Sequence, residues 1–318
     1  MQSMAEQQSV AAAANEVLEQ VNRVIVGKNE VLRWALAAML SGGHILLEDI
    51  PGVGKTTMAL AFSKAMDLEY SRVQFTPDVL PSDVTGYSVL DQKTGELQYQ
   101  KGAVLCNLFL ADELNRATSR TQSALLEAME EGQVTVDGVT HKLPSPFIVL
   151  ATQNPTGAAG TSLLPDSQMD RFTVRLSMGY PDAANEVAMV LDRRAGNPLA
   201  ALTALMNREG LAALQEEVAK THVSEEVVSY IVALINATRT SEQLLRGASP
   251  RATLAVTAMS KAVAQLNGRD YVVPEDVREV FIKTVAHRML LSPSAEGQGL
   301  SAEDVLGTIV ERVPAPRL

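Results

Sequence analysis

The 318-residue sequence contains a single cysteine, Cys106, which excludes an intrachain disulfide and a cysteine-ligated metal cage. Burial as a small hydrophobic residue is the ordinary role of such a cysteine. Basic residues are also outnumbered: 27 lysines and arginines stand against 37 aspartates and glutamates, for a net charge of −10. A protein that binds nucleic acid needs a basic surface to displace counterions, so we expect no nucleic acid partner unless an oligomer assembles a local basic patch.

Long apolar segments are missing as well. No run approaches the roughly 20 residues that cross a bilayer. The N-terminus lacks the basic and then apolar pattern of a secretion signal, and the four histidines show no metal-ligand spacing. We therefore expect a cytoplasmic α/β protein without a membrane span, long enough for two domains.

The most informative segment covers residues 44–57, which read HILLEDIPGVGKTT. Its apolar start predicts a buried strand, and residues 58–66 beyond it predict a helix. A strand, a glycine-bearing loop, Lys-Thr and a helix form the arrangement that binds polyphosphates. The residues that we expect to contact the nucleotide here are Pro51, Gly52, Val53, Gly54, Lys55, Thr56 and Thr57.

Each residue type in this loop has a chemical reason. Gly52 and Gly54 allow the backbone to curl so that its N–H groups point at a phosphate, and the helix N-terminus adds partial positive charge. Lys55 supplies a full charge for the outer phosphates, and the Thr56 hydroxyl can ligate Mg²⁺. Asp49 stands where the consensus has glycine. Because it ends the strand, we expect its carboxylate to point away from the phosphates.

Strands alternate with helices up to about residue 180, which predicts a five-stranded parallel sheet covered by helices on both faces. Two hairpins interrupt this pattern, near 87–99 and 133–142, the second turning at Asp137-Gly138. From Ala183 onward the patterns are helical, with a helix start at Ser249-Pro250. We predict a nucleotide-binding α/β domain over 1–180 and a small all-helical domain over 181–318.

Two acids follow the largely apolar segment 107–111 directly, at the end of a predicted strand. Ligands bind at the carboxyl ends of such strands. We predict that Asp112 holds Mg²⁺ through water and that Glu113 polarises the attacking water. Asn154 ends the next buried strand, where it either orients the same water or a phosphate oxygen, or starts a turn before Pro155.

Two arginines and one apolar patch leave alternatives open. Arg171 opens the last predicted strand, and Arg251 lies in the first turn of a helix, where a cation opposes the helix dipole. A bound phosphate would explain Arg251, whereas a solvated arginine is the alternative for both. The Val24–Gly27 patch is either a packing contact or a wall of an adenine pocket that includes Val26 and Gly27.

The sequence resembles the MoxR branch of AAA+ ATPases from about Asn22 onward. The matching segments are long, so chance similarity is very improbable. They comprise residues 46–56, 108–117, the EAMEEGQ run at 127–133, the ATQNP run at 151–155, Asp170-Arg171-Phe172, the SPRA run at 249–252 and the DYVVPEDV run at 270–277.

The resemblance implies roles that spacing does not supply. Members form rings, usually hexamers, with ATP at subunit boundaries. Lys55 and Thr56 match Walker A, Asp112 and Glu113 match Walker B, and Asn154 matches the sensor asparagine. Arg171 matches the arginine finger, which acts on the neighbouring subunit's ATP, and Arg251 matches the sensor arginine of the helical lid.

The family also implies a chaperone-like role in maturing client proteins or loading their metal cofactors, commonly with a partner that carries a von Willebrand factor A domain. The two hairpins match insertions near the central pore. Three other functions use the same loop: a phosphotransferase, a DNA-directed motor or clamp loader, and a nucleotide-gated scaffold. A phosphotransferase would need an acceptor molecule, whereas an ATP-driven remodelling protein hydrolyses ATP without one. A salt-dependent gel shift would identify a DNA-directed motor. The presence of Glu113 argues against a non-catalytic scaffold.

Overall fold

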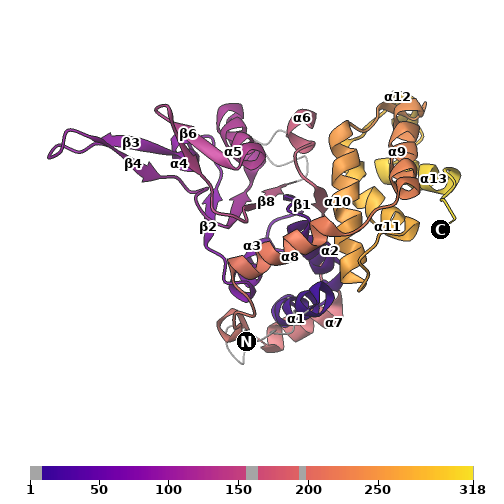
Figure 1. Ribbon diagram of the computed structural model, residues 1–318, viewed down its shortest axis with the longest axis horizontal. Helices are drawn as coiled ribbons and strands as arrows, with labels where there is room; N and C mark the ends of the chain where they lie inside the picture. The colour runs from indigo at the N-terminus through magenta and orange to yellow at the C-terminus, as the bar shows by residue number, and fades with distance from the viewer. Residues whose placement is uncertain (1–8, 155–163, 193–197, 318) are drawn as a thin grey trace, which may run out of the picture.

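The computed structural model describes residues 9–154, 164–192 and 198–317. At its centre is a five-stranded sheet whose strands all run parallel (Figure 1). The strand order across the sheet is β2 (Tyr70–Gln74), β5 (Leu108–Asp112), β8 (Ile148–Gln153), β1 (Ile45–Glu48) and β9 (Val174–Leu176). The predicted five-stranded parallel sheet is confirmed.

Successive side chains of each strand point to opposite faces of the sheet, and the strands therefore contribute to two hydrophobic cores. Ile45 and Leu47 of β1 point into one core, whereas Leu46 points into the other. Neighbouring strands follow the same rule, as expected where both faces of a sheet are buried. The first core also takes in α1 (Val10–Asn22), α2 (Asn29–Leu40) and α3 (Lys55–Ala65), and the second takes in α4 (Pro81–Thr85), α5 (Ser119–Glu131) and α6 (Asp166–Met169).

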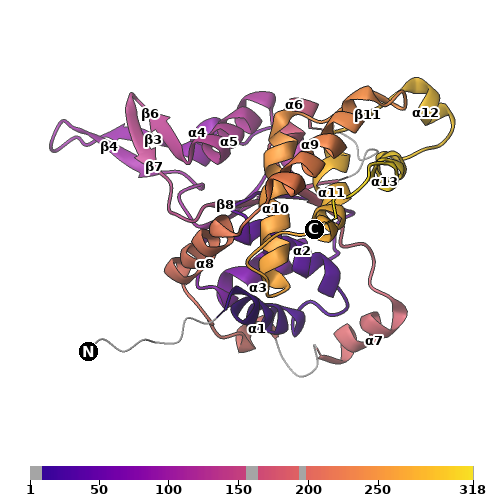
Figure 2. The same cartoon turned by 45° about the vertical axis from the view of Figure 1, so that its right-hand side comes forward.

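Two antiparallel hairpins lie outside the central sheet. They are β3–β4 (Gly86–Leu90 and Leu97–Lys101) and β6–β7 (Gln133–Val136 and Val139–Lys142). The rings of Tyr99 and His141 join them, stacked with centroids 3.7 Å apart. Both hairpins extend to one side of the molecule (Figures 1 and 2). Several large apolar side chains of these hairpins are exposed: Tyr87, Leu90, Leu97 and Val139.

The C-terminal region is built from helices. They are α7 (Ala183–Asp192), α8 (Arg208–Lys220), α9 (Glu225–Thr240), α10 (Pro250–Leu266), α11 (Pro274–Val285), α12 (Pro293–Gly297) and α13 (Ala302–Arg312). One detail differs from the predicted all-helical domain, because β10 (Leu244–Arg246) and β11 (Leu290–Leu291) form a short antiparallel pair. This pair joins the end of α9 to the segment after α11, and sequence periodicity does not register strands of two or three residues.

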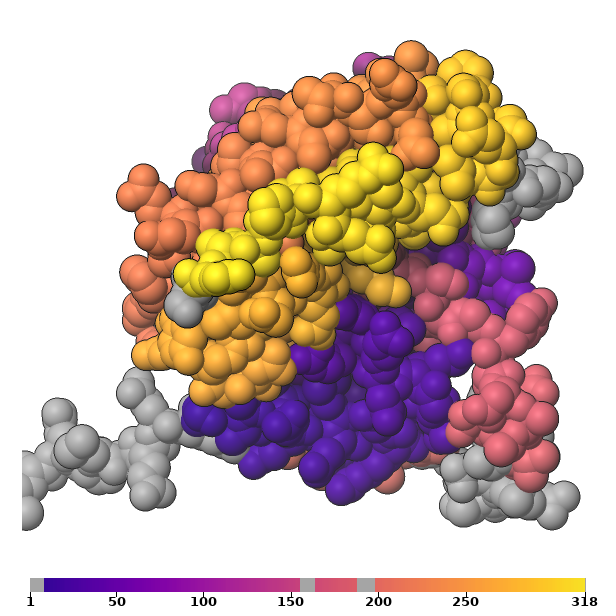
Figure 3. All heavy atoms as spheres, turned by 90° about the vertical axis from the view of Figure 1, so that its right-hand side faces the viewer, coloured from indigo at the N-terminus to yellow at the C-terminus, as the bar shows by residue number. Residues whose placement is uncertain are grey.

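The helical region packs on the first core and continues it. Helix α10 contacts both α2 and α1, and one apolar cluster runs from α1 through α10 to α13. Figure 3 shows the C-terminal helices lying directly over the N-terminal residues. Arg175 of β9 adds a polar link, since it pairs with Glu48 on one side and with Glu303 of α13 on the other. Within the described ranges, every helix is too short or too polar to cross a membrane.

Candidate active site

The loop between β1 and α3 has the backbone shape that a phosphate ligand requires. Gly52 and Gly54 have φ angles of +88° and +98°, in the region that only glycine adopts without strain. Helix α3 begins at Lys55, three residues before the predicted start at Met58, and Gly54 is its N-cap. Because no side chain caps this helix, its first N–H groups are left for a ligand.

Lys55 is buried beneath this loop. Its Nζ donates a hydrogen bond of 2.7 Å to the main-chain carbonyl of Asp49. Burial lowers the Lys55 pKa, and the carboxylates of Asp49, Asp112 and Glu113 act in the opposite direction. An ammonium group whose partner is a neutral carbonyl gains a stronger, charge-assisted contact when a phosphate arrives.

The carboxylate of Asp112 is held at the end of β5 by two neighbours. Thr152 Oγ1 donates to its Oδ1 at 2.7 Å, and Arg72 Nη2 lies 2.7 Å from its Oδ2. The same Thr152 hydroxyl accepts a hydrogen bond from the Glu113 main-chain N–H at 2.8 Å. One buried threonine therefore fixes both acidic residues relative to each other.

Glu113 adopts a φ angle of +55°, which is uncommon for a residue other than glycine. Strain of this kind persists where the surrounding structure fixes a functional side chain. Arg116 Nη1 lies 2.7 Å from Glu113 Oε2, and Asn154 Nδ2 donates to Oε1 at 3.2 Å. Glu113 and Asn154, which sequence analysis placed at the ends of successive strands, are thus in direct contact, while Pro155 lies outside the described residues.

Sequence analysis missed three residues of this group: Thr152, Arg72 and Arg116. Thr152 carried a signal, since it stands two residues before Asn154 in the same buried strand. The register of β5 on β8 pairs Ala111 with Ala151 and so brings Thr152 beside Asp112. Arg72 lies on β2, and only the strand order, which the sequence does not state, makes β2 the neighbour of β5.

The residues present fit a polyphosphate and a magnesium ion. An added Cβ at Gly52 would meet no atom within 4 Å, so the space above the loop is open. Among the described residues no three His, Cys, Asp or Glu side chains converge as a metal cage. A hard ion held by Thr56 and Asp112 would take its remaining ligands from phosphate and water, which is the usual habit of Mg²⁺.

The Val24–Gly27 patch, which could form a wall of the adenine pocket, is partly buried and partly exposed. Ile25 is buried in the first core, whereas Val26 is half-buried and Gly27 is exposed. Lys28 Nζ donates a 2.8 Å hydrogen bond to the carbonyl of Tyr180, which joins this patch to the segment after β9. Ile25 thus packs inward, whereas Gly27 lies against the Asn185 side chain, which occupies the place that a Cβ on Gly27 would take.

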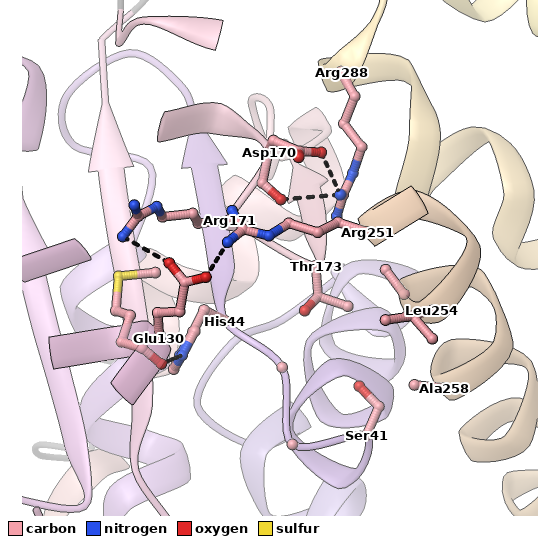
Figure 4. A pocket seen from close by; sticks show the side chains of 14 residues that line it. Ser41, His44, Glu130, Asp170, Arg171, Thr173, Arg251, Leu254, Ala258 and Arg288 are labelled. Atoms are coloured by element: carbon pink, nitrogen blue, oxygen red, sulfur yellow. Dashed lines mark hydrogen bonds and ion pairs between the residues drawn. The ribbon is translucent and has the colours of Figure 1, made fainter. Parts of the chain in front are cut away.

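Arg171 and Arg251 lie together at the opposite end of the sheet. Both guanidinium groups contact the carboxylate of Glu130 on α5, at 3.2 Å for Arg171 (Figure 4). They line a cavity of about 280 Å³ together with Gly43 and His44, which directly precede β1. The phosphate loop follows the other end of β1, so the two sites are separated by the length of that strand.

This placement separates Arg251 from the other predicted nucleotide ligands. Strand β1 has four residues, and a rise of about 3.3 Å per residue puts its first and last Cα atoms roughly 10 Å apart. The structure therefore groups Arg251 with Arg171 and not with Lys55 of the same chain. The neighbouring Asp170 carboxylate is also held in place, because it accepts hydrogen bonds from Arg288 Nη1 at 2.7 Å and from Ser249 Oγ at 2.9 Å.

Comparison with known proteins decides the family. The model of the ATPase family associated with various cellular activities matches residues 44–174, and the AAA lid domain model matches residues 236–309. Chaperone MoxR1 of Mycobacterium tuberculosis is 38% identical over 94% of this chain and 81% of its own length. The chain belongs to the MoxR family of AAA+ ATPases.

Two further comparisons cover nearly all of this MoxR-family chain. The uncharacterized protein YeaC of Bacillus subtilis is 43% identical over 98% of both chains. A crystal structure described as an ATPase from Cytophaga hutchinsonii superimposes with a TM-score of 0.90 at 37% identity, covering 97% of this chain and 96% of that one. The predicted fold, an AAA+ core with a helical lid, is confirmed, and the chain is an ATPase of this family.

Proposed function

We propose that this chain binds Mg²⁺·ATP at the phosphate loop and uses ATP hydrolysis to remodel client proteins. One observation supports the chemistry most strongly: Glu113 is held by Asn154 and Arg116 at the strand end next to Lys55. In that position its carboxylate can polarise an attacking water, while Asn154 orients it. Lys55 and Thr56 would bind the outer phosphates and the ion, which Asp112 would hold through water.

Catalysis at this site would require a second subunit. Hydrolysis develops negative charge on the transferred phosphoryl group, and an arginine that reaches it accelerates the reaction. Arg171 and Arg251 are on the far end of the sheet from the ATP of their own chain. We propose that both face the ATP of a neighbouring subunit in a ring, most simply a hexamer. Glu130 would hold them in the isolated chain.

The client-directed part of the proposal has separate support. Mycobacterial MoxR1 is named a chaperone, and the two hairpins expose apolar side chains away from the ATPase site. We propose that the hairpins contact a client, that a von Willebrand factor A domain protein assists, and that insertion of a metal cofactor is one possible outcome. A cytoplasmic location and a boundary between core and lid near residue 180 complete the proposal.

A phosphate-release assay on the purified chain tests this function. We expect steady hydrolysis of ATP that needs no acceptor molecule and stops when EDTA removes Mg²⁺. Transfer of phosphate to a small molecule, without release to water, would instead indicate a phosphotransferase. A pull-down with the Glu113→Gln protein held in ATP would then identify the client, since hydrolysis no longer ends the ATP state.

A further inference from the structure

Asp49 stands where the general phosphate-loop pattern has a glycine, and its side chain is 6% exposed. The carboxylate accepts three hydrogen bonds from the segment that follows β9. Ser177 Oγ donates to Oδ1 at 2.7 Å, the Met178 N–H donates to Oδ2 at 2.7 Å, and the Gly179 N–H donates to Oδ1 at 3.0 Å. We call residues 177–181, which lead from the core into the helical region, the connector.

The main chain of Asp49 contacts the phosphate-binding machinery at the same time. Its carbonyl accepts the bond from Lys55 Nζ, and its N–H donates to the Gln153 carbonyl of β8 at 3.3 Å. One residue therefore touches the phosphate-binding lysine through its backbone and the connector through its side chain.

The connector borders the predicted base side of the nucleotide site. The Met178 side chain packs on the phosphate loop, because its Cε lies 3.7 Å from the place that a Cβ on Gly54 would take. Tyr180 is bonded through its carbonyl to Lys28, directly after Val26 and Gly27. The connector thus lies between the phosphate loop and the patch predicted to form the adenine pocket.

We propose that Asp49 is a positioning residue that fixes the connector as the adenosine-side wall of the nucleotide site. This inference rests on the proposed ATP-binding function. All three groups that face the carboxylate are donors, so a pure acceptor suits them. An asparagine would turn an NH₂ donor toward at least one of them, and a glycine would leave the buried Met178 N–H and the half-buried Gly179 N–H without this partner.

The test is a comparison of two ligands by calorimetry, ATP and inorganic tripolyphosphate, each with Mg²⁺. Tripolyphosphate occupies the phosphate loop and has no base or ribose. In Asp49→Asn we expect the affinity for ATP to fall by at least about tenfold, as loss of charge-assisted hydrogen bonds implies, while the affinity for tripolyphosphate stays near that of the wild type. Glu48→Gln is the matched control, since Glu48 precedes Asp49 but pairs with Arg175, and should change neither affinity.

The outcomes separate this inference from the function on which it rests. Equal losses of affinity for both ligands would show that Asp49 only supports the phosphate loop. No loss of affinity for either ligand would show that the connector is not part of the nucleotide site. Both of these results overturn the inference. Ser177→Ala, which removes one of the three bonds, should give a smaller loss selective for ATP and decides the matter if Asp49→Asn does not fold. A wild-type chain that binds neither ligand would instead refute ATP binding itself.

Discussion

At the scale of single residues, we propose that nucleotide binding depends most on the side chain of Lys55. Its ammonium is buried with a neutral carbonyl as partner, so a phosphate is the ligand that would satisfy its charge. We expect Lys55→Ala to lose measurable ATP affinity in calorimetry. Lys64→Ala is the control, because Lys64 lies on the same helix and its Nζ donates to the Leu199 carbonyl at 3.0 Å. Near-normal affinity in Lys55→Ala would contradict the phosphate-loop assignment.

Substitution of Glu113 should slow ATP hydrolysis without weakening ATP binding. Glutamine keeps the shape of the side chain and can still contact Asn154, but it cannot accept a proton from water. We expect Glu113→Gln to retain ATP affinity while kcat falls by roughly two orders of magnitude or more. Binding by calorimetry and phosphate release together measure this difference. A large loss of ATP affinity would indicate that Glu113 is a metal ligand, and the roles assigned to Glu113 and Asp112 would then be wrong.

His44 gives the fold a pH dependence. It is half-buried beside Met129 and Val149: its Nδ1 accepts the Val149 N–H at 3.0 Å, and its Nε2 lies 3.2 Å from the Met129 carbonyl. Burial lowers its pKa from 6.5 to about 4. The unfolded chain therefore binds the proton more readily, so the stabilisation is complete above pH 6.5 and is lost as the pH falls toward 4, by roughly 3 kcal/mol.

Urea unfolding at pH 7.5 and pH 5 measures this effect. The His44→Gln variant is the control, since an amide can accept from Val149 and donate to Met129 without titrating. We expect the free energy of unfolding to fall less between the two pH values in His44→Gln than in the wild type. His287, whose pKa burial also lowers, remains in both proteins and leaves part of the slope. Identical slopes would exclude His44 as a source of the pH dependence.

At the scale of elements, periodicity predicted most helices and strands but not which strands are neighbours. The helix start predicted at Ser249-Pro250 is that of α10, and the hairpin at Asp137-Gly138 has the predicted strands. These features depend on local residue patterns. The contact of Arg72 with Asp112 joins residues 40 positions apart, and the docking of α10 on α2 joins two separate regions of the chain. Such contacts follow from strand order and packing, which local patterns do not specify.

The same reasoning applies to the candidate site. Lys55, Asp112, Glu113 and Asn154 could be predicted because each ends or begins a recognisable element at one edge of a parallel sheet. The position of Arg251 could not, because it depends on where the helical region docks. Ser249 shows how docking alters local roles: it precedes α10 as its N-cap, yet its hydroxyl bonds to Asp170 and not to the helix.

The hairpins should be separable from the ATPase core. Each is a two-stranded unit outside the central sheet, and such units contribute little to its stability. We expect replacement of the 91–96 turn, or of Asp137-Gly138 and its neighbours, by a short glycine linker to leave ATPase activity and thermal stability near those of the wild type. Binding of the client captured by Glu113→Gln should be lost. Global unfolding of either variant would show that its hairpin is a structural part of the core.

At the scale of the whole molecule, core and lid share one hydrophobic cluster, and the site residues divide between two ends of the sheet. Lys55, Asp112, Glu113 and Asn154 lie at the carboxyl end, whereas Arg171 lies at the amino end with Arg251. Under the proposed mechanism the chain completes its active site by association, with the arginine end of one copy facing the phosphate loop of the next. Ring formation is thus the central claim of the proposed mechanism.

Mixing two inactive variants tests that claim most directly. Arg171→Ala should bind ATP but hydrolyse it roughly 10³–10⁵ times more slowly, and Lys55→Ala should bind none while still presenting its arginine. After light scattering confirms that mixed rings form, we expect ATPase activity to reappear and to peak at intermediate mixing ratios, because Lys55→Ala subunits supply Arg171 to ATP held by their neighbours. Mixed rings that stay inactive at every ratio would contradict the action of Arg171 across the subunit boundary.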